Sequence, residues 1–433
     1  MIKNFSSLIH NCSEDEKRHY REFLLVSIDE ILFELSHRNY FEDYQDLELE
    51  KPLVIAVGKG AYGMFDKFSR VYEYAYGIIS SYPIPSKFKN VELYSGGHPF
   101  PNGESIMAAR RAVELLENFD YKSLVFLVSG GGSSMFELPR VPLEDLVKTT
   151  ELLLSSGANI DEINTVRKHL SYVKGGQILK WLKSKTYAFL MSDVIGDRVD
   201  LIASGLTTCD SSTFMDALTV LQRYGLISKV PETVRDVIIR GCEGLEEETL
   251  KDCEYAQKMV KNFVILKNSN FLEKLKESAN KMGIKVMDLG SDNHQDVEEL
   301  VSVFVDISRR HYLKNGKPLM VLAGGEVKVK VSNPSGKGGR NQELALRVAL
   351  AMSKIETKFI FVAIGTDGID GSSDAAGAIV DDTTLRRGKE AGLDALEFLK
   401  GNNSNEFFRI LGDAVFTGPT GINLKDVYCL LLY

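Results

Sequence analysis

Short apolar runs alternate with amphipathic segments of helical length along most of this 433-residue chain. In the first half, the runs that we expect to form strands lie at 52–57, 76–81, 91–94, 123–128 and 186–191. Several are apolar throughout rather than at every second residue, which is typical of parallel strands buried on both faces. Helices are predicted between them, most clearly at 103–118 and 143–156. This order predicts an α/β fold with a Rossmann-like, doubly wound, mainly parallel sheet.

The pattern changes after about residue 206, where two helical segments precede a charged stretch. Strand-like runs then recur at 262–266, 284–289, 318–323, 327–331, 358–364 and 426–432. Because a single core rarely grows beyond about 250–300 residues, the length predicts two domains. We expect one at 1–245, including a long first helix whose capping box begins at Ser13, and a second α/β domain with a mixed sheet at 246–433.

Composition disfavours several classes of partner. The formal net charge of -8 and the pI of about 5.6 argue against a nucleic-acid partner, which requires a basic face. No apolar run approaches the about 20 residues that span a bilayer, so no membrane partner is expected. The five cysteines are scattered and lack a C-x-x-C pair, which disfavours structural zinc and favours a reducing cytoplasm. The acidic chain with its long first helix could form a homodimer.

The glycine turn at 58–63 follows the first strand and satisfies G-x-G-x-x-G, the spacing of a dinucleotide-binding turn. The next strand, however, ends in Ser80 and Ser81 instead of the acid that would bind a ribose. Lys59 adds a cation to this turn, where a helix N-terminus already favours anions. We interpret Lys59 as a phosphate or carboxylate contact; a surface lysine beside a tight turn is the alternative.

A second turn, SGGGSS at 129–134, joins another buried strand to a helix. Successive backbone N–H groups in such a turn can form an anion-binding concavity. We therefore predict phosphate or substrate binding by Gly130, Gly131, Gly132, Ser133 and Ser134. A flexible glycine turn is the alternative.

A local basic cluster lies at 164–174 in this otherwise acidic chain. Arg167 and Lys174 are candidates for binding carboxylate or phosphate. We expect His169, between them, to pack or hydrogen-bond rather than to catalyse. A solvated helix face is the alternative interpretation of the cluster.

Acidic residues follow two buried strands. Asp193 and Asp197 come after 186–191, and Asp367 lies in the turn GTDGIDG after 358–364. Ligands of open α/β sheets bind beyond the carboxyl ends of strands, where acids can hold Mg²⁺ or accept a proton. All three are therefore candidate metal ligands, and Asp367 is also a candidate contact for substrate or for a nucleotide hydroxyl. Polar loops whose acids cap a helix are the alternative.

Polar residues also follow glycines in the second half. Glu326 ends the sequence GGE and is a candidate substrate contact. Arg340 and Asn341 begin a helix after a glycine loop, where their donors would face an anion. Glycine-rich turns at strand ends in both halves predict a polyanion-binding cleft between the domains.

Together these segments resemble the type II glycerate kinases, whose C-terminal half carries the MOFRL region, at about 315–428 here. The similar segments are AVGKG (56–60), SGGGSS (129–134), INTVRKHLS (163–171), KGG (174–176), SDVIGDR (192–198), ASG (203–205), GGE (324–326), GGRNQE (338–343), GTDGIDG (365–371) and TGPTGIN (417–423). The resemblance implies two α/β domains with the active site in the cleft between them. It also implies ATP-dependent phosphorylation of D-glycerate with Mg²⁺, and Lys59, Asp193 and Arg340 as catalytic residues. Segment 207–210 matches least well.

The resemblance favours phosphorylation of the 2-hydroxyl over the 3-hydroxyl of glycerate. Family members have also been labelled hydroxypyruvate reductases, so an NAD(P)H-dependent reductase is the alternative enzyme. A non-catalytic protein that binds sugar phosphates is a third reading, although the acids after two strands disfavour it.

Overall fold

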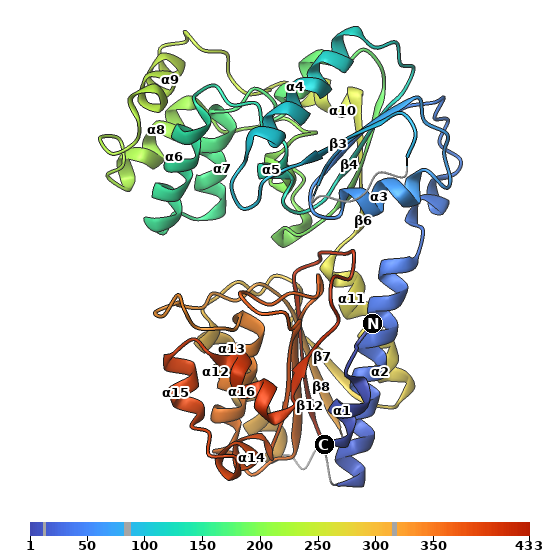
Figure 1. Ribbon diagram of the computed structural model, residues 1–433, viewed down its shortest axis with the longest axis vertical. Helices are drawn as coiled ribbons and strands as arrows, with labels where there is room; N and C mark the ends of the chain where they lie inside the picture. The colour runs from blue at the N-terminus through green and yellow to red at the C-terminus, as the bar shows by residue number, and fades with distance from the viewer. Residues whose placement is uncertain (12–13, 82–87, 314–317) are drawn as a thin grey trace. The chain divides into compact units, whose positions relative to one another are not determined.

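The computed structural model of the chain describes residues 1–11, 14–81, 88–313 and 318–433 (Figure 1). The chain folds into two compact units. Asn39–Ile265 forms the first, here called the central unit. Met1–Arg38 and Leu266–Tyr433 together form the second, here called the terminal unit. This division differs from the predicted boundary at residue 245 in two ways. Residues 246–265, with most of the strand predicted at 262–266, belong to the central unit, and residues 1–38 belong to the terminal unit.

Buried charge explains why helix α2 (Asp15–His37) belongs to the terminal unit. The fully buried Arg21 lies 2.8 Å from the carboxylates of both Asp381 and Asp413, which follow it by 360 and 392 residues. A buried cation is tolerated only with such partners, so these ion pairs fix α2 to the unit that supplies them. The predicted N-cap Ser13 lies outside the described residues.

The sheet of the central unit has six strands in the order β3-β2-β1-β4-β5-β6. They are β1 (Leu53–Val57), β2 (Tyr76–Ser81), β3 (Val91–Ser95), β4 (Leu124–Val128), β5 (Thr186–Met191) and β6 (Val260–Leu266). The pairs that connect β3, β2, β1, β4 and β5 are all parallel, which confirms the predicted Rossmann-like sheet. As a result, the turns that follow β1, β4 and β5 lie at the same edge.

Helices cover this sheet, and a group of them lies beside it on one side (Figure 1). They are α3 (Ala61–Phe68), α4 (Gly103–Asn118), α5 (Gly132–Met135), α6 (Leu143–Ser155), α7 (Ile160–His169), α8 (Phe214–Arg223), α9 (Glu232–Cys242) and α10 (Cys253–Met259). Alternate residues of β1, Leu53 and Ile55, pack with Ala108 and Ala112 of α4. Helices α6 to α9 share a separate core around Phe214.

The sheet of the terminal unit is mixed, as predicted, with the order β11-β10-β9-β12-β8-β7. Its strands are β7 (Lys285–Asp288), β8 (Leu319–Gly325), β9 (Phe359–Gly365), β10 (Gly377–Asp381), β11 (Ala414–Val415) and β12 (Asp426–Leu432). Only β7 and β8 pair in parallel. The short β10 and β11 are additions to the prediction.

The predicted strand at 327–331 is wrong. After β8 ends at Gly325, the chain leaves the sheet, and only an isolated bridge between Asp296 and Lys328 remains. The alternation of valine and lysine there favours an extended backbone, but a strand also needs a neighbour along its length.

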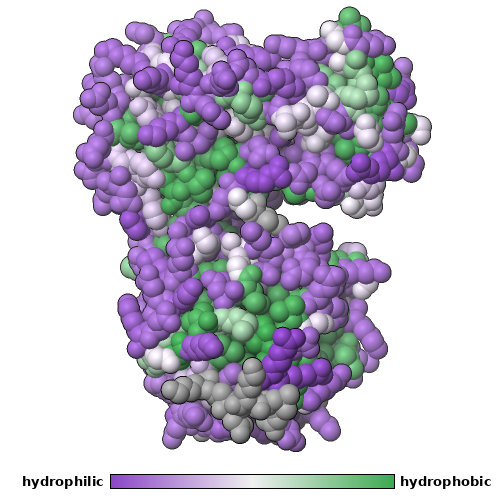
Figure 2. Space-filling model, turned by 180° about the vertical axis from the view of Figure 1, so that it is seen from behind, coloured by the Kyte–Doolittle hydropathy of each residue, from purple (hydrophilic) through white to green (hydrophobic). Residues whose placement is uncertain are grey.

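Helices lie on both faces of this sheet (Figure 1). One face carries α1 (Phe5–His10), α2 and α11 (Asn268–Lys281); the other carries α12 (Val297–Leu313), α13 (Arg340–Met352), α14 (Thr384–Glu390), α15 (Ala395–Lys400) and α16 (Ser404–Leu411). In Figure 2, hydrophilic residues dominate the visible surface of each unit, with smaller hydrophobic patches between them. Within the described segments, no helix combines the length and apolarity needed to cross a membrane.

Candidate active site

Two glycine turns of the central unit pack directly against each other. Gly58 has a φ of 114°, and a Cβ at this position would lie 2.4 Å from the carbonyl oxygen of Ser129. The Gly60 amide donates to Ser129 Oγ at 2.9 Å, and the Lys59 amide donates to the Gly130 carbonyl at 2.8 Å. These contacts give the glycines of the first turn a packing role that does not involve a dinucleotide.

The side chain of Lys59 runs along the second turn. Gly131 has a φ of 83°, and a Cβ there would meet Lys59 Cγ at 3.1 Å. The buried hydroxyl of Ser134 donates to the Gly131 carbonyl at 3.1 Å and so holds the turn in shape. Ser133 is only partly buried. The structure thus brings Lys59 together with Gly130 and Gly131, whereas Ser134 points inward.

Arg167 of α7 reaches the same turn from another part of the chain. Its Nη2 donates to the Ser133 carbonyl at 2.8 Å, and the residue is 8% exposed. Its Nε is buried and has no hydrogen-bond partner among the described residues. Burial lowers the pKa of Arg167, although nearby Glu137 opposes this. The guanidinium therefore keeps an unsatisfied donor close to the second glycine turn, along which the Lys59 side chain lies. An anionic ligand would accept a hydrogen bond from this donor.

Lys174, also predicted to bind substrate, lies in the interior instead. It is 1% exposed, and its Nζ lies 2.7 Å from Glu137 Oε2 and 2.9 Å from the Phe136 carbonyl. Burial lowers its pKa to about 8, against the opposing charge of Glu137. We therefore assign Lys174 to the support of the turn after β4 rather than to substrate binding.

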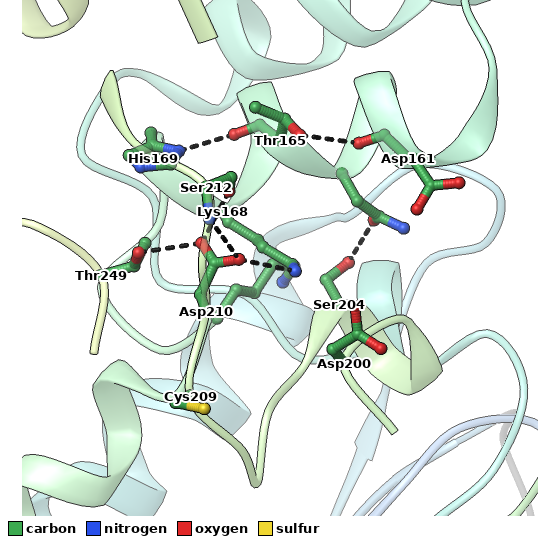
Figure 3. A network of polar contacts seen from close by, with 12 residues as sticks. Asp161, Thr165, Lys168, His169, Asp200, Ser204, Cys209, Asp210, Ser212 and Thr249 are labelled. Carbon is green, nitrogen blue, oxygen red and sulfur yellow. Dashed lines mark hydrogen bonds and ion pairs between the residues drawn. The ribbon is translucent and has the colours of Figure 1, made fainter. Parts of the chain in front are cut away.

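The neighbouring basic residues of α7 also have structural partners. Lys168 donates to Asp210 at 3.1 Å, and the same carboxylate accepts hydrogen bonds from Ser212 and Thr249 (Figure 3). The fully buried His169 contacts Glu248 through Nε2 at 3.0 Å, which confirms that it hydrogen-bonds and packs. Arg167, Lys168 and His169 are all buried, but acidic partners engage Lys168 and His169, which distinguishes them from Arg167.

The loop after β5 carries Asp193 and Asp197 and then folds back to the glycine turn. Asp193 lies two residues beyond β5 and is partly buried. Further along, Ala203 and Ser204 have φ angles of 48° and 57°. This backbone places Ser204 Oγ 2.9 Å from Ser133 Oγ, and its hydroxyl donates to Asn164 at 2.7 Å (Figure 3). The loops after β4 and β5 are thus joined at one edge of the sheet.

In the terminal unit, Arg340 begins α13 and forms a bidentate contact with Asp426 of β12. Nη2 donates to Oδ1 at 3.0 Å, and Nε donates to Oδ2. Glu326, another predicted substrate contact, lies 3.0 Å from Nη1 of the same arginine. Burial raises the pKa of Asp426 to about 6 despite the charge of Arg340. We therefore assign Glu326 and Asp426 to the positioning of Arg340.

Asn341 is fully buried, and its amide group and backbone N–H both donate to Asp370 Oδ1, at 3.1 and 3.0 Å. Gln342 donates to the other oxygen of Asp370, so this carboxylate caps the start of α13. Asn341 therefore holds Asp370 in place, which is a structural role that its predicted function as an anion contact did not include.

Known proteins resemble the chain over nearly its full length. The Domain of unknown function (DUF4147) matches residues 26–239, and the MOFRL family matches residues 319–426. Glycerate 2-kinase of Pyrococcus horikoshii is 40% identical over 385 residues, which cover 87% of this chain and 86% of the relative. D-glycerate 2-kinase of Thermotoga maritima is 38% identical over 400 residues, which cover 89% and 92%. The chain belongs to the glycerate 2-kinase family.

The crystal structure of a glycerate kinase from Thermotoga maritima has the same fold as this family member, with a TM-score of 0.84. The two are 36% identical, and the match covers 97% of this chain and 100% of the other. This agreement extends to both α/β units, which supports the predicted fold class throughout the described residues.

The candidate metal ligands of this glycerate 2-kinase family member come from both units. Asp193 and Asp197 belong to the central unit, and Asp367 to the terminal unit. Asp367 and Asp426 flank Gly365, where a Cβ would meet their Oδ1 atoms at 3.2 and 3.4 Å. Among the described residues, no three His, Cys, Asp or Glu side chains are grouped to hold a metal ion.

Sequence reasoning missed several partners that shape the site. Asp426 could have been noticed as the single acid at the start of an otherwise apolar strand, DVYCLLL. A disulfide between Cys209 and Cys253, 44 residues apart, had no signal in the cysteine spacing. It lies next to Asp210, the partner of Lys168 (Figure 3). The cysteine pattern had favoured a reducing environment, and the pairing of these two residues was not predicted.

Proposed function

We propose that this chain transfers the γ-phosphoryl group of ATP to the 2-hydroxyl of D-glycerate, giving ADP and 2-phosphoglycerate. The observation that carries the proposal is the meeting of Lys59 and Arg167 at one glycine turn. Both substrates are anions, and Arg167 keeps a buried donor that no described residue accepts from. The names of the relatives indicate glycerate as the substrate, and the geometry of the turn provides groups that would bind it.

Phosphoryl transfer depends mainly on positioning and on the neutralisation of charge. Lys59 stabilises negative charge on the transferring phosphoryl group or the substrate. Asp193, just beyond β5, orients the attacking hydroxyl and accepts its proton. Arg340, held by Asp426, binds either the phosphates or the glycerate carboxylate. Gly130, Gly131 and Ser133 offer backbone and hydroxyl donors beside Lys59. The amide of Gly132, also predicted to bind substrate, already donates to the Ser129 carbonyl at 3.2 Å.

Mg²⁺ fits this set of residues, because it commonly takes one or two carboxylates together with water and substrate phosphates. Asp193, Asp197 and Asp367 are the candidates to hold it. Binding through one or two of these carboxylates does not require three protein ligands that are already grouped. When bound, Mg²⁺ would neutralise charge on the phosphates of ATP. A cytoplasmic location and a homodimer also stay predictions.

The reductase alternative is weaker. Gly58 and Gly60 serve the contact with Ser129, and the end of β2 presents hydroxyls rather than an acid. Ser80 Oγ donates to the Met135 carbonyl, and Ser81 Oγ donates to the Lys59 carbonyl at 3.4 Å. These serines hold the surrounding loops together.

A coupled assay with D-glycerate, ATP and Mg²⁺ tests the proposal. The product is passed to enolase without phosphoglycerate mutase. ADP release together with an enolase signal is expected. A signal that requires mutase would show transfer to the 3-hydroxyl instead. No ADP release would refute the kinase, and NADH oxidation with hydroxypyruvate would then test the reductase.

A further inference from the structure

His98 lies against the glycine turn beside Lys59, but it has no part in the roles assigned so far. A Cβ at Gly131 would meet His98 Cδ2 at 3.0 Å and Nε2 at 3.6 Å. The same Cβ would meet Lys59 Cγ at 3.1 Å. The imidazole and the lysine stem therefore both line the Gly131 backbone, where His98 stays exposed on its other side.

Burial and the charges that face His98 together set its protonation state. Partial burial, followed by the positive charges of Lys59 and Arg167, lowers the pKa of His98 to about 4. The ring is consequently neutral at pH 7, with one nitrogen that donates and one that accepts hydrogen bonds. Two permanent cations thus share the turn with one neutral group that has both hydrogen-bonding capacities.

This combination matches the chemistry of a dihydroxy acid. A carboxylate and a phosphoryl group need cations or donors, which Lys59 and Arg167 supply. A hydroxyl that does not react can both donate and accept, and a neutral imidazole can do either in return, whereas an ammonium or guanidinium group can only donate to it. We propose that His98 is a specificity-determining residue that hydrogen-bonds the hydroxyl of glycerate that is not phosphorylated. The inference rests on the proposed function and extends it to substrate selection.

The test compares two ligands that differ in this hydroxyl alone. D-lactate has the carboxylate and the 2-hydroxyl of D-glycerate but lacks the 3-hydroxyl. Calorimetry would give the affinity of the full-length protein for each ligand, before and after His98→Ala. We expect D-glycerate to bind about 10-fold more weakly to the variant, the loss of one hydrogen bond, with D-lactate binding unchanged. The same loss is expected in kcat/KM for D-glycerate, with an unchanged KM for ATP.

Two further variants separate recognition from structure. His98→Gln keeps a donor and an acceptor, so it should recover part of the affinity for D-glycerate. His10→Ala changes an exposed histidine whose Nδ1 lies 2.6 Å from the Ser6 carbonyl of its own helix, and it should change neither affinity. Thermal unfolding midpoints should agree among all these proteins, because His98 is exposed.

Two results would overturn the role of His98. One is equal weakening of D-glycerate and D-lactate binding, which would indicate a general effect on the turn. The other is D-glycerate affinity that does not change in His98→Ala. Absence of ADP release from the unaltered protein would instead refute the proposed kinase activity, and the binding comparison would still decide what His98 contacts.

Discussion

Arg340 at the start of α13 donates hydrogen bonds to both carboxylate oxygens of Asp426 in β12, with Nη2 3.0 Å from Oδ1. Asp426 is fully buried, whereas 32% of the Arg340 side chain remains exposed. Such a bidentate pair sets the plane of the guanidinium as well as its position. The buried acid therefore presents an oriented cation at the surface of the terminal unit, as the binding of an anionic substrate requires.

The Arg340–Asp426 pair predicts how activity depends on pH. Because burial raises the pKa of Asp426 to about 6, acidification through pH 6 protonates it and removes the charge that positions Arg340. We expect kcat/KM to fall below pH 6, and Asp426→Asn to lack this decline while being about 10-fold less active at pH 8. Steady-state kinetics from pH 5 to 9 would measure both.

Protonation of Asp426 does not itself unfold the protein. Its folded-state pKa lies above the ordinary value of 3.8, so the folded state binds this proton more tightly, and falling pH between about 6 and 4 favours folding at this site. The matched variant Asp236→Asn, on an exposed helix face, should keep the acid decline. An identical decline in Asp426→Asn would assign it to another group, including ATP.

Replacement of Lys59 tests the anion site of the central unit. Its stem lies along Gly131, so Lys59→Ala should remove the charge and leave the fold intact. We expect kcat/KM to fall by at least about 10²-fold, as is typical when a group that stabilises transition-state charge is lost. The exposed Lys229 provides a control, since Lys229→Ala should change nothing. An unchanged kcat/KM in Lys59→Ala would make Lys59 a surface lysine.

Asp193 is predicted to act on the proton of the attacking hydroxyl. Asp193→Asn keeps the shape of the side chain and removes its basicity. We expect kcat to fall by about 10²–10⁴-fold, the usual contribution of general acid–base catalysis, with an unchanged thermal unfolding midpoint. Asp236→Asn again serves as the matched control. Near-normal turnover by Asp193→Asn would remove this residue from the mechanism.

The disulfide predicts a redox-dependent stability. Cys209 and Cys253 close a loop with a sequence separation of 44, and such cross-links contribute typically about 2–4 kcal/mol by restricting the unfolded chain. Cys209→Ser should lower the free energy of unfolding in urea by about that amount. Dithiothreitol should do the same to the unaltered protein. Cys242→Ser, which replaces a partly buried free thiol, is the control, and its free energy of unfolding should change far less.

Local patterns predicted most strands because apolar runs report burial directly. All five strands expected in the first half are present, and β5 matches its predicted range at Thr186–Met191. The run at 327–331 failed because a strand exists only where a neighbour pairs with it, and the sequence does not show neighbours. The N-terminal helix was assigned to the wrong half for a related reason, since Arg21 finds its acids 360 or more residues away.

The sequence by itself determined the alternation of strands and helices and the glycine turns that follow the strands, because both depend on residues close in the chain. Only the tertiary structure decided which charged groups face a ligand and which face each other. Arg167 and Lys174 look equivalent in sequence, but the fold leaves Arg167 an unpaired donor and encloses Lys174 with Glu137. Burial and pairing between distant residues set these differences, and neither can be read from local spacing.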